Sequence, residues 1–200
     1  MASQPHPRLT PEEYLEIERK AEWKSEFYNG RMFAMAGGSA RHSLITGNAM
    51  TALNLALEDQ PSTVGANDLR VNMSQEGLYT YPDATVVCGD IKLADSKMDT
   101  LLNPTVIVEV LSPSTEACDR GFKFEQYMKI EALQEYVLVA QSKPRVEIFR
   151  RQPDGDWMLR TVEGLEGSCR LESVNCSIPM SRIYAKVNFG EEPEGTPPGP

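Results

Sequence analysis

The chain has 200 residues, which is enough for one domain with a substantial core. Its formal net charge of -9 argues against a protein that coats nucleic acid non-specifically, because such proteins are basic, although a local basic groove remains compatible with it. No apolar run reaches the roughly 20 residues that a membrane span needs, and the N-terminus shows no apolar segment of a secretory signal, so we expect a cytoplasmic protein.

The cysteines point to structural thiols. Cys88, Cys118, Cys169 and Cys176 form no CxxC pair, which disfavours a zinc site. We expect all of them to be reduced, as in cytoplasmic proteins, and Cys88, at the end of an apolar stretch, to be a core thiol.

The N-terminal part is predicted to form a helix followed by a hairpin. Thr10 can cap the helix, Pro11 suits the first helical position, and Glu13 completes a capping box. This helix is expected to run to about residue 22. Asn29-Gly30 is typical of a tight turn, so it predicts a hairpin between "SEFY" and "RMFAM".

A second helix and a series of strands are predicted for the rest of the chain. Ser39 can cap a helix that runs to about Glu58, with an inward stripe of Ile45, Ala49, Leu53 and Ala56. Residues 90–103 are expected to be a polar connection, residues 115–133 a helix and residues 179–187 a short closing helix. The expected strands span residues 68–73, 78–88, 106–111, 135–141, 145–151 and 157–162.

These elements predict one α/β (α+β) domain over residues 1–189, with a mixed central β-sheet flanked by helices and extra β-hairpins. Residues 190–200 are rich in Pro, Gly and Glu and are expected to form a disordered tail.

An acidic residue lies in the middle of the most apolar predicted strand. Glu109 stands in "VIVEVL", where a buried carboxylate loses its hydration unless something compensates it. Asp83 has a similar setting, directly after Pro82 and before "ATVV". Two such carboxylates on neighbouring strands repel each other, and a hard divalent cation, Mg²⁺ or Mn²⁺, would remove that repulsion. The alternative is that each acid pairs with a buried arginine or caps a turn.

The helix predicted after Glu109 adds a lysine. Asp119, Lys123 and Tyr127 are spaced four residues apart, so they lie on one helical face. A lysine near a metal and a phosphate can orient the attacking water or stabilise developing negative charge. By spacing alone, a solvated Asp119–Lys123 surface pair explains this pattern better.

Several stretches together resemble one known family. They are "YPDATVV", "NPTVIVEVLSPSTEACDRGFKFEQY" and "LQEYVLVAQ", preceded by "SEFYNGRMFAMAGGSARHSLITGNAM" and "NDLRV". In this order they resemble the Uma2 (DUF820) family of the PD-(D/E)xK nuclease-like superfamily over about residues 10–187. The resemblance implies the restriction-endonuclease-like fold.

The resemblance also implies a set of site residues. Asp83 and Glu109 match the two acids of the superfamily, which implies that they bind the metal and take part in catalysis. The signature lysine two residues beyond Glu109 is replaced here by Leu111, and the resemblance implies that Lys123 supplies the catalytic charge instead. Glu26 and His42 match further residues that line the site in the family.

The last two residues also have ordinary interpretations. Glu26 precedes a hairpin and is compatible with a surface acid, and His42 lies on the inward stripe of its helix and is compatible with a core histidine. Asp68 and Asp119 are weaker candidates for the site.

We therefore expect an endonuclease that uses Mg²⁺ (or Mn²⁺), with one or two ions, to hydrolyse nucleic acid, preferably DNA. One alternative is a non-catalytic nuclease-fold protein with a binding or regulatory role, which the acidic charge and Leu111 favour; another is a hydrolase of smaller phosphoesters. A homodimer is expected, because cleavage of both strands of a duplex is simplest with two sites related by a twofold axis. Residues 145–151 and 157–162 are the expected interface.

Overall fold

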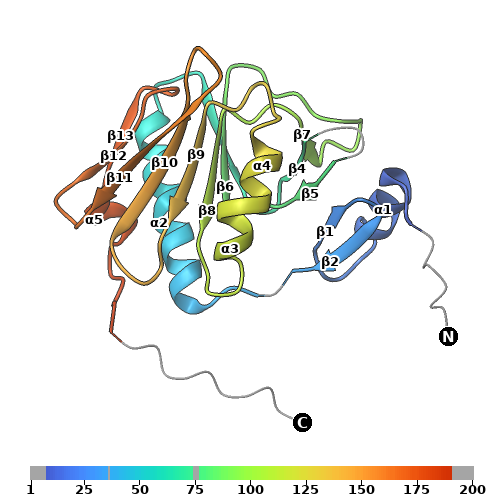
Figure 1. Ribbon diagram of the computed structural model, residues 1–200, viewed down its shortest axis with the longest axis horizontal. Coiled ribbons are helices and arrows are strands. Elements are labelled where there is room, and N and C mark those ends of the chain that lie inside the picture. Colours follow the sequence, from blue (N-terminus) through green and yellow to red (C-terminus); the bar gives the residue numbers. More distant parts are fainter. Residues whose placement is uncertain (1–7, 36, 74–76, 191–200) are drawn as a thin grey trace, which may run out of the picture.

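The computed structural model describes residues 8–35, 37–73 and 77–190, and a six-stranded sheet forms its centre (Figure 1). The strands run in the order β11-β10-β9-β8-β6-β3. Only β8 and β9 are parallel among these neighbours, so the sheet is mixed, as predicted. The strands are β3 (Ser62–Ala66), β6 (Ala84–Cys88), β8 (Val106–Val110), β9 (Glu135–Val139), β10 (Arg145–Arg151) and β11 (Trp157–Glu163).

A second sheet has five short strands in the order β2-β1-β5-β4-β7. Its members are β1 (Ser25–Tyr28), β2 (Arg31–Ala34), β4 (Arg70–Asn72), β5 (Tyr79–Thr80) and β7 (Thr100–Leu101). The single long strand predicted for residues 78–88 is wrong, because the chain leaves this sheet after β5 and enters the central sheet at β6. Pro82 lies at this crossing, where its missing N–H removes one donor that a continuous strand would need. The predicted polar connection also contains β7.

The local signals of the N-terminal half are confirmed. Helix α1 spans Pro11–Glu18 and has the complete capping box of Thr10 and Glu13, although it ends before residue 22. The turn between β1 and β2 places Asn29 and Gly30 at φ values of 48° and 79°, the left-handed region that these two residue types tolerate best. Helix α2 spans Ala40–Leu57, and the Ser39 side chain accepts a hydrogen bond at its N-terminus.

The predicted helix over residues 115–133 is shorter and less regular than expected. It consists of α3 (Glu116–Cys118), a π-helical turn (Asp119–Lys123) and α4 (Phe124–Tyr127). The closing helix α5 is confirmed at Met180–Ile183. Sequence analysis missed the hairpin of β12 (Ser168–Leu171) and β13 (Cys176–Pro179).

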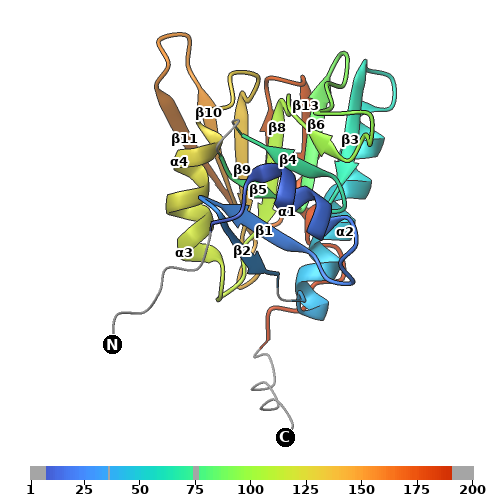
Figure 2. The ribbon, with the colours of Figure 1, turned by 90° about the vertical axis from the view of Figure 1, so that its right-hand side faces the viewer.

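The central sheet is buried on both faces. Figure 2 looks onto the broad side of this sheet, with the α3–α4 segment on the left near β9 and β10 and α2 on the right near β3. Ile45 and Leu53 of α2 pack with Val108 in one cluster, whereas Tyr127 packs with Ile107 in the other. Alternate residues of β8 thus serve two cores, which explains its continuous apolar run.

The side chain of Cys88 is exposed, so its assignment to the core is wrong. It is the last residue of β6, and Gly89 turns the chain away at a φ of 81°. All four cysteines are free thiols. Among the described residues we find no helix with the length and apolarity needed to span a membrane. The expected disordered tail, apart from residue 190, lies outside the described residues.

Candidate active site

A large open cleft lies beyond the carboxyl ends of β8 and β9. It has a volume of about 1160 Å³, above the range of about 300–1,000 Å³ that is typical of small-molecule pockets. Residues that follow β8 and β9 line it, and the carboxyl ends of strands are where α/β sheets commonly bind ligands. All five residues predicted for the site line this one cleft: Glu26, His42, Asp83, Glu109 and Lys123.

The pairing of β6 with β8 brings the two strand acids together. Ala84 lies opposite Val108, so the same antiparallel register puts Asp83, one residue before β6, beside Glu109 on the same face. Asp83 Oδ2 accepts a hydrogen bond from the Val110 N–H at 2.7 Å, and Oδ1 lies 3.0 Å from His42 Nε2. Burial raises the pKa of Asp83, and the Val110 N–H and His42 offset only part of this effect.

Glu109 is only 4% exposed and is held through one carboxylate oxygen. Its Oε1 accepts hydrogen bonds from the Tyr127 hydroxyl at 2.8 Å and from Lys123 Nζ at 3.3 Å. Burial raises the pKa of Glu109 to about 8; Lys123 lowers it, while Asp119 and Asp83 raise it further. In the metal-free protein the carboxyl is therefore mostly protonated at neutral pH, and this is how the buried strand tolerates it.

Lys123 lies at the centre of an acidic cluster. Its Nζ is 3.0 Å from Glu26 Oε1, 3.2 Å from Asp119 Oδ1 and 3.3 Å from Glu109 Oε1. Burial lowers the pKa of Lys123, but Glu109, Glu26 and Asp119 outweigh burial and raise it well above the ordinary value. Lys123 and Asp119 are 6% and 2% exposed, so the interpretation as a solvated surface pair is wrong.

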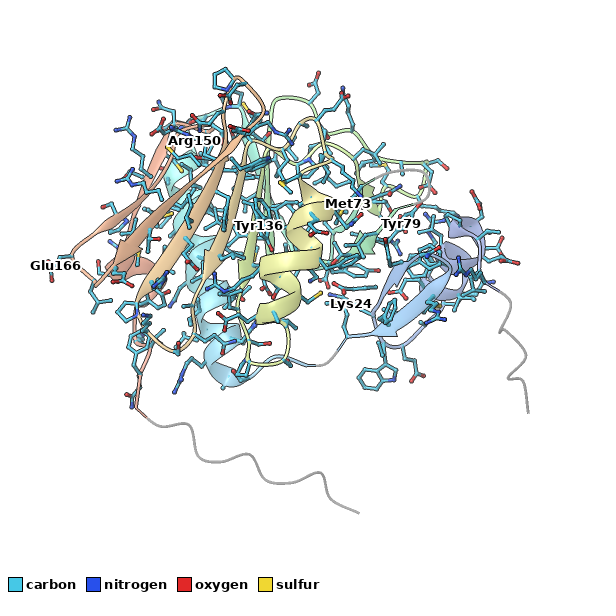
Figure 3. All side chains as sticks on the ribbon, viewed as in Figure 1. Lys24, Met73, Tyr79, Tyr136, Arg150 and Glu166 are labelled. Carbon is cyan, nitrogen blue, oxygen red and sulfur yellow. The ribbon has the colours of Figure 1, made fainter. Side chains whose placement is uncertain are left out.

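The π-helical turn positions two of these side chains. A π turn contains one more residue than an α turn, and such turns are frequent at functional sites. Here it directs both Asp119 and Lys123 inward. The Tyr136 hydroxyl of β9 donates to the Asp119 carbonyl at 3.0 Å and fixes the turn to the sheet, and Figure 3 shows Tyr136 beside this segment.

Sequence analysis missed two polar residues that hold the cleft in shape. The Thr80 hydroxyl donates to Glu26 Oε1, and no sequence signal marks that residue. Gln141 Nε2 donates to the Leu111 carbonyl at 2.7 Å, and its Oε1 accepts from the Ser39 hydroxyl at 3.0 Å, which ties β8 to the start of α2. A signal for Gln141 exists, because it is the polar residue that directly follows a buried strand.

Asp68 is not part of the acidic cluster. It is an exposed residue that forms an ion pair with Lys24, which lies between α3 and the β1–β2 hairpin in Figure 3. Lys24 itself lines the cleft, and its ammonium lies 5.3 Å from the centre of the Tyr81 ring.

The donors at the bottom of the cleft suit a hard cation. Asp83 and Glu109 offer carboxylate oxygens, and the buried Asp119 Oδ1 is in an ion pair with Lys123 but accepts no hydrogen bond from the described residues. Across residues 8–35, 37–73 and 77–190, no group of three or more His, Cys, Asp or Glu side chains is arranged to hold a metal by itself. A Mg²⁺ ion fits this situation, since it usually binds one or two carboxylates and keeps several waters.

The fold and the acidic cleft place the protein in the restriction-endonuclease-like class. A crystal structure described as a "putative nuclease belonging to DUF820", from Anabaena variabilis ATCC 29413, has the same fold, with a TM-score of 0.72 over 88% of this chain and 98% of that chain at 16% identity. The family described as "Uma2: Putative restriction endonuclease" matches residues 11–180, and the chain belongs to this family.

Two uncharacterized proteins of Synechocystis sp. (strain ATCC 27184 / PCC 6803 / Kazusa) are similar over most of their length. The protein slr1290 is 35% identical over 187 residues, which covers 94% of this chain and 97% of that protein. The protein sll1609 is 36% identical over 156 residues, which covers 78% of this chain and 88% of that protein.

Proposed function

We propose that this protein is a divalent-metal-dependent endonuclease that hydrolyses phosphodiester bonds of nucleic acid, with DNA as the expected substrate. The observation that carries the proposal is the meeting of Asp83, Glu109 and Lys123 in one open cleft. The family description, "Putative restriction endonuclease", and that of the solved structure with the same fold, "putative nuclease", support the proposal.

In this proposal Asp83 and Glu109 hold Mg²⁺ or Mn²⁺. A bound ion lowers the pKa of its water and stabilises negative charge on a phosphate. Glu109 gives up its proton to act as a ligand, because only the carboxylate form binds a metal. Lys123 keeps its proton, since its pKa is raised, so it acts as a hydrogen-bond donor and positive charge at a phosphate oxygen and not as a base.

Basic side chains around the cleft support a polyanionic substrate. Together with Lys123 they equal the acidic lining residues in number, and four of them form ion pairs with acids in the free protein. In this proposal they exchange those partners for phosphates, and phosphate contacts of this kind position a nucleic acid without reading its sequence. The basic lining residues besides Lys123 are Lys24, Arg41, Arg120, Lys143 and Arg145.

The direct test is cleavage of labelled single- and double-stranded DNA and RNA in Mg²⁺ or Mn²⁺, with EDTA as the metal-free control. Asp83→Asn and Glu109→Gln are expected to lower the cleavage rate at least about a hundredfold. Glu135→Gln is the matched control, because Glu135 is also a buried strand glutamate but does not line the cleft. Equal rates for Glu109→Gln and Glu135→Gln would contradict the proposed site.

The rival function is binding without cleavage. Leu111 occupies the position of the signature lysine, and Lys123 is held by three acids. If the purified protein binds Mg²⁺ and nucleic acid but cleaves no DNA or RNA, a binding function replaces the proposed endonuclease. If it hydrolyses only small phosphoesters, the protein is a phosphoesterase.

We also propose a homodimer formed through β11, the last strand of the central sheet. Within the part of the chain that the structure describes, no strand pairs with its outer edge, and its Met158 and Leu159 side chains are 44% and 49% exposed. Such a dimer would carry two clefts, which is the simplest arrangement for cleavage of both strands of a duplex. Light scattering is expected to give twice the monomer mass, and a monomer mass for wild type would refute the dimer.

A further inference from the structure

One face of the β1–β2 hairpin continues the active-site cleft to the surface. Glu26, which contacts Lys123, lies directly opposite Phe33 in the antiparallel register. The Met35 N–H donates to the Lys24 carbonyl, which extends the pairing by one step. Because residues two apart on a strand share a face, Lys24 and Met35 lie on the same side as Glu26 and Phe33, and Lys24, Glu26 and Met35 line the cleft.

Phe33 is exposed on this face although it is an aromatic residue in a strand. Its exposed fraction is 49%, and that of Met35 is 38%. Further into the same sheet face, Thr80 and Val71 are fully buried, so the exposure begins where the cleft begins. Direct opposition on paired strands puts the Cβ atoms of Phe33 and Glu26 within about 5.5 Å of each other.

Phe33 does not itself line the cleft, so what marks it is its neighbour. Leu55 is 58% exposed but lies on α2 and has no cross-strand neighbour, and scattered surface residues of this kind are normal. Phe33, in contrast, has a residue of the acidic cluster as its cross-strand neighbour. Exposed Arg31 lies two residues away on the same strand face, so a positive charge flanks the ring, as a phosphate backbone requires.

We infer that Phe33 is a stacking platform for an unpaired base next to the phosphate in the cleft. The inference rests on the proposed function and narrows its substrate to single-stranded nucleic acid or a duplex that is melted at that phosphate. Aromatic side chains bind single strands by stacking on base faces, which are covered in an intact duplex. Lys24 and Arg31 supply backbone contacts on either side of the ring.

The test measures binding of labelled 20-nucleotide DNA probes in EDTA, so that no cleavage occurs. The probes are a single strand with bases, the same length of abasic backbone, and a duplex. Phe33→Ala is expected to weaken binding of the single strand about tenfold and to leave the abasic probe unchanged, whereas Phe33→Trp keeps wild-type affinity. Leu55→Ala is the control for loss of an exposed apolar side chain and is expected to bind all probes like wild type.

Three outcomes would overturn the inference. They are unchanged single-strand binding by Phe33→Ala, an equal loss for the abasic probe, and a wild-type dimer that Phe33→Ala converts to a monomer, which would assign the face to self-association. Thermal melting checks that each variant is folded. If Phe33→Ala does not fold, Phe33→Trp still tests the inference, because it is expected to bind the single strand with wild-type affinity. Cleavage by wild type in Mg²⁺ separates the two failures: if wild type cleaves but Phe33→Ala binds normally, only the stacking platform is refuted.

Discussion

Two buried glutamates on adjacent strands of the central sheet have opposite surroundings. Glu109 of β8 and Glu135 of β9 lie on opposite faces, since Glu135 is paired with Val106, three residues before Glu109. The carboxylate of Glu135 accepts hydrogen bonds from the N–H groups of Glu172 and Ser173 at 3.1 and 3.2 Å and from the Ser173 hydroxyl. That of Glu109 faces Lys123 and other acids.

Burial alone therefore does not mark a functional acid. Burial raises the pKa of both glutamates, but the carboxylate of Glu135 accepts hydrogen bonds from a turn away from the cleft, and these bonds offset part of the effect of burial. Glu109 is surrounded by charges that compensate one another only in part, and it lines an open cleft. The difference between a structural and a reactive acid lies in what else converges on it.

The largest difference between the two glutamates should appear when Lys123, the positive charge beside Glu109, is removed. Lys123→Ala leaves Glu26, Glu109 and Asp119 without their shared positive charge, and we expect the free energy of unfolding in EDTA to fall by about 3–5 kcal/mol. Added Mg²⁺ should recover part of this loss. Urea denaturation is the measurement, and Lys143→Ala, which removes an exposed lysine in a 3.6 Å ion pair, is the control, with a loss below about 1 kcal/mol. Similar losses for the two variants would show that the cluster is not energetically special.

The second largest difference should be in how substitution of each glutamate changes the stabilisation by Mg²⁺. Wild type and Glu135→Gln are both expected to gain about 2.7 kcal/mol of stability when Mg²⁺ is at a hundred times its dissociation constant. Glu109→Gln should lose most of this gain, because it lacks one of the two proposed ligands. Thermal melting with and without Mg²⁺ measures the effect. A full Mg²⁺ response in Glu109→Gln would make Glu109 a structural residue only.

Without metal, Glu135→Gln should be less stable than wild type, whereas Glu109→Gln should not. Glu135→Gln is expected to lower stability by about 1–2 kcal/mol, since a neutral amide accepts weaker hydrogen bonds from the turn. Glu109→Gln should melt at or above wild type at pH 7, because the amide replaces a carboxyl that is already mostly protonated. Calorimetry in EDTA checks both, and a strongly destabilised Glu109→Gln would count against a protonated Glu109 in the metal-free protein.

The pH dependence gives the finest distinction. The pKa of Glu109 is raised from its ordinary 4.5 to about 8 in the folded protein, so the folded state holds a proton that the unfolded state releases. The stability of wild type relative to Glu109→Gln should therefore be highest below pH 4.5 and fall as pH rises to about 8, by at most about 1.4 kcal/mol per pH unit. Urea denaturation of both proteins across this range in EDTA tests the sign. A flat difference would mean that folding leaves the pKa of Glu109 unchanged, and a rising one that folding lowers it.

Local signals predicted much of the fold. Thr10, Ser39 and Asn29-Gly30 act within a few residues of themselves, and the structure confirms each of them. The break between β5 and β6 and the β12–β13 hairpin were missed, because they depend on which sheet or core a segment packs against. A pattern of apolar residues does not indicate which sheet or core a strand will join.

The candidate site was predictable only where strand geometry decides it. The occurrence of two acids in neighbouring strands predicted that their side chains lie close together, and Asp83 and Glu109 do line one cleft. The burial of Lys123 and its contact with Glu26 were not predictable from spacing, since Glu26 belongs to a distant hairpin and a π turn replaces the regular helix. The catalytic and metal-binding roles of these residues remain predictions for the assays above.

The π-helical turn makes the length of this segment matter more than its composition. Gly121 has an open surrounding in which an added Cβ meets no atom within 4 Å, so Gly121→Ala fits. Loss of one residue there would turn one end of the helix against the other by about 100° and carry Lys123 away from Glu109. Homologous proteins that keep the cluster should therefore keep Asp119 and Lys123 and vary at Gly121 between them, but show no insertions or deletions from Glu116 to Lys123. The length of this segment in a sequence alignment then reports whether the geometry of the cleft is preserved.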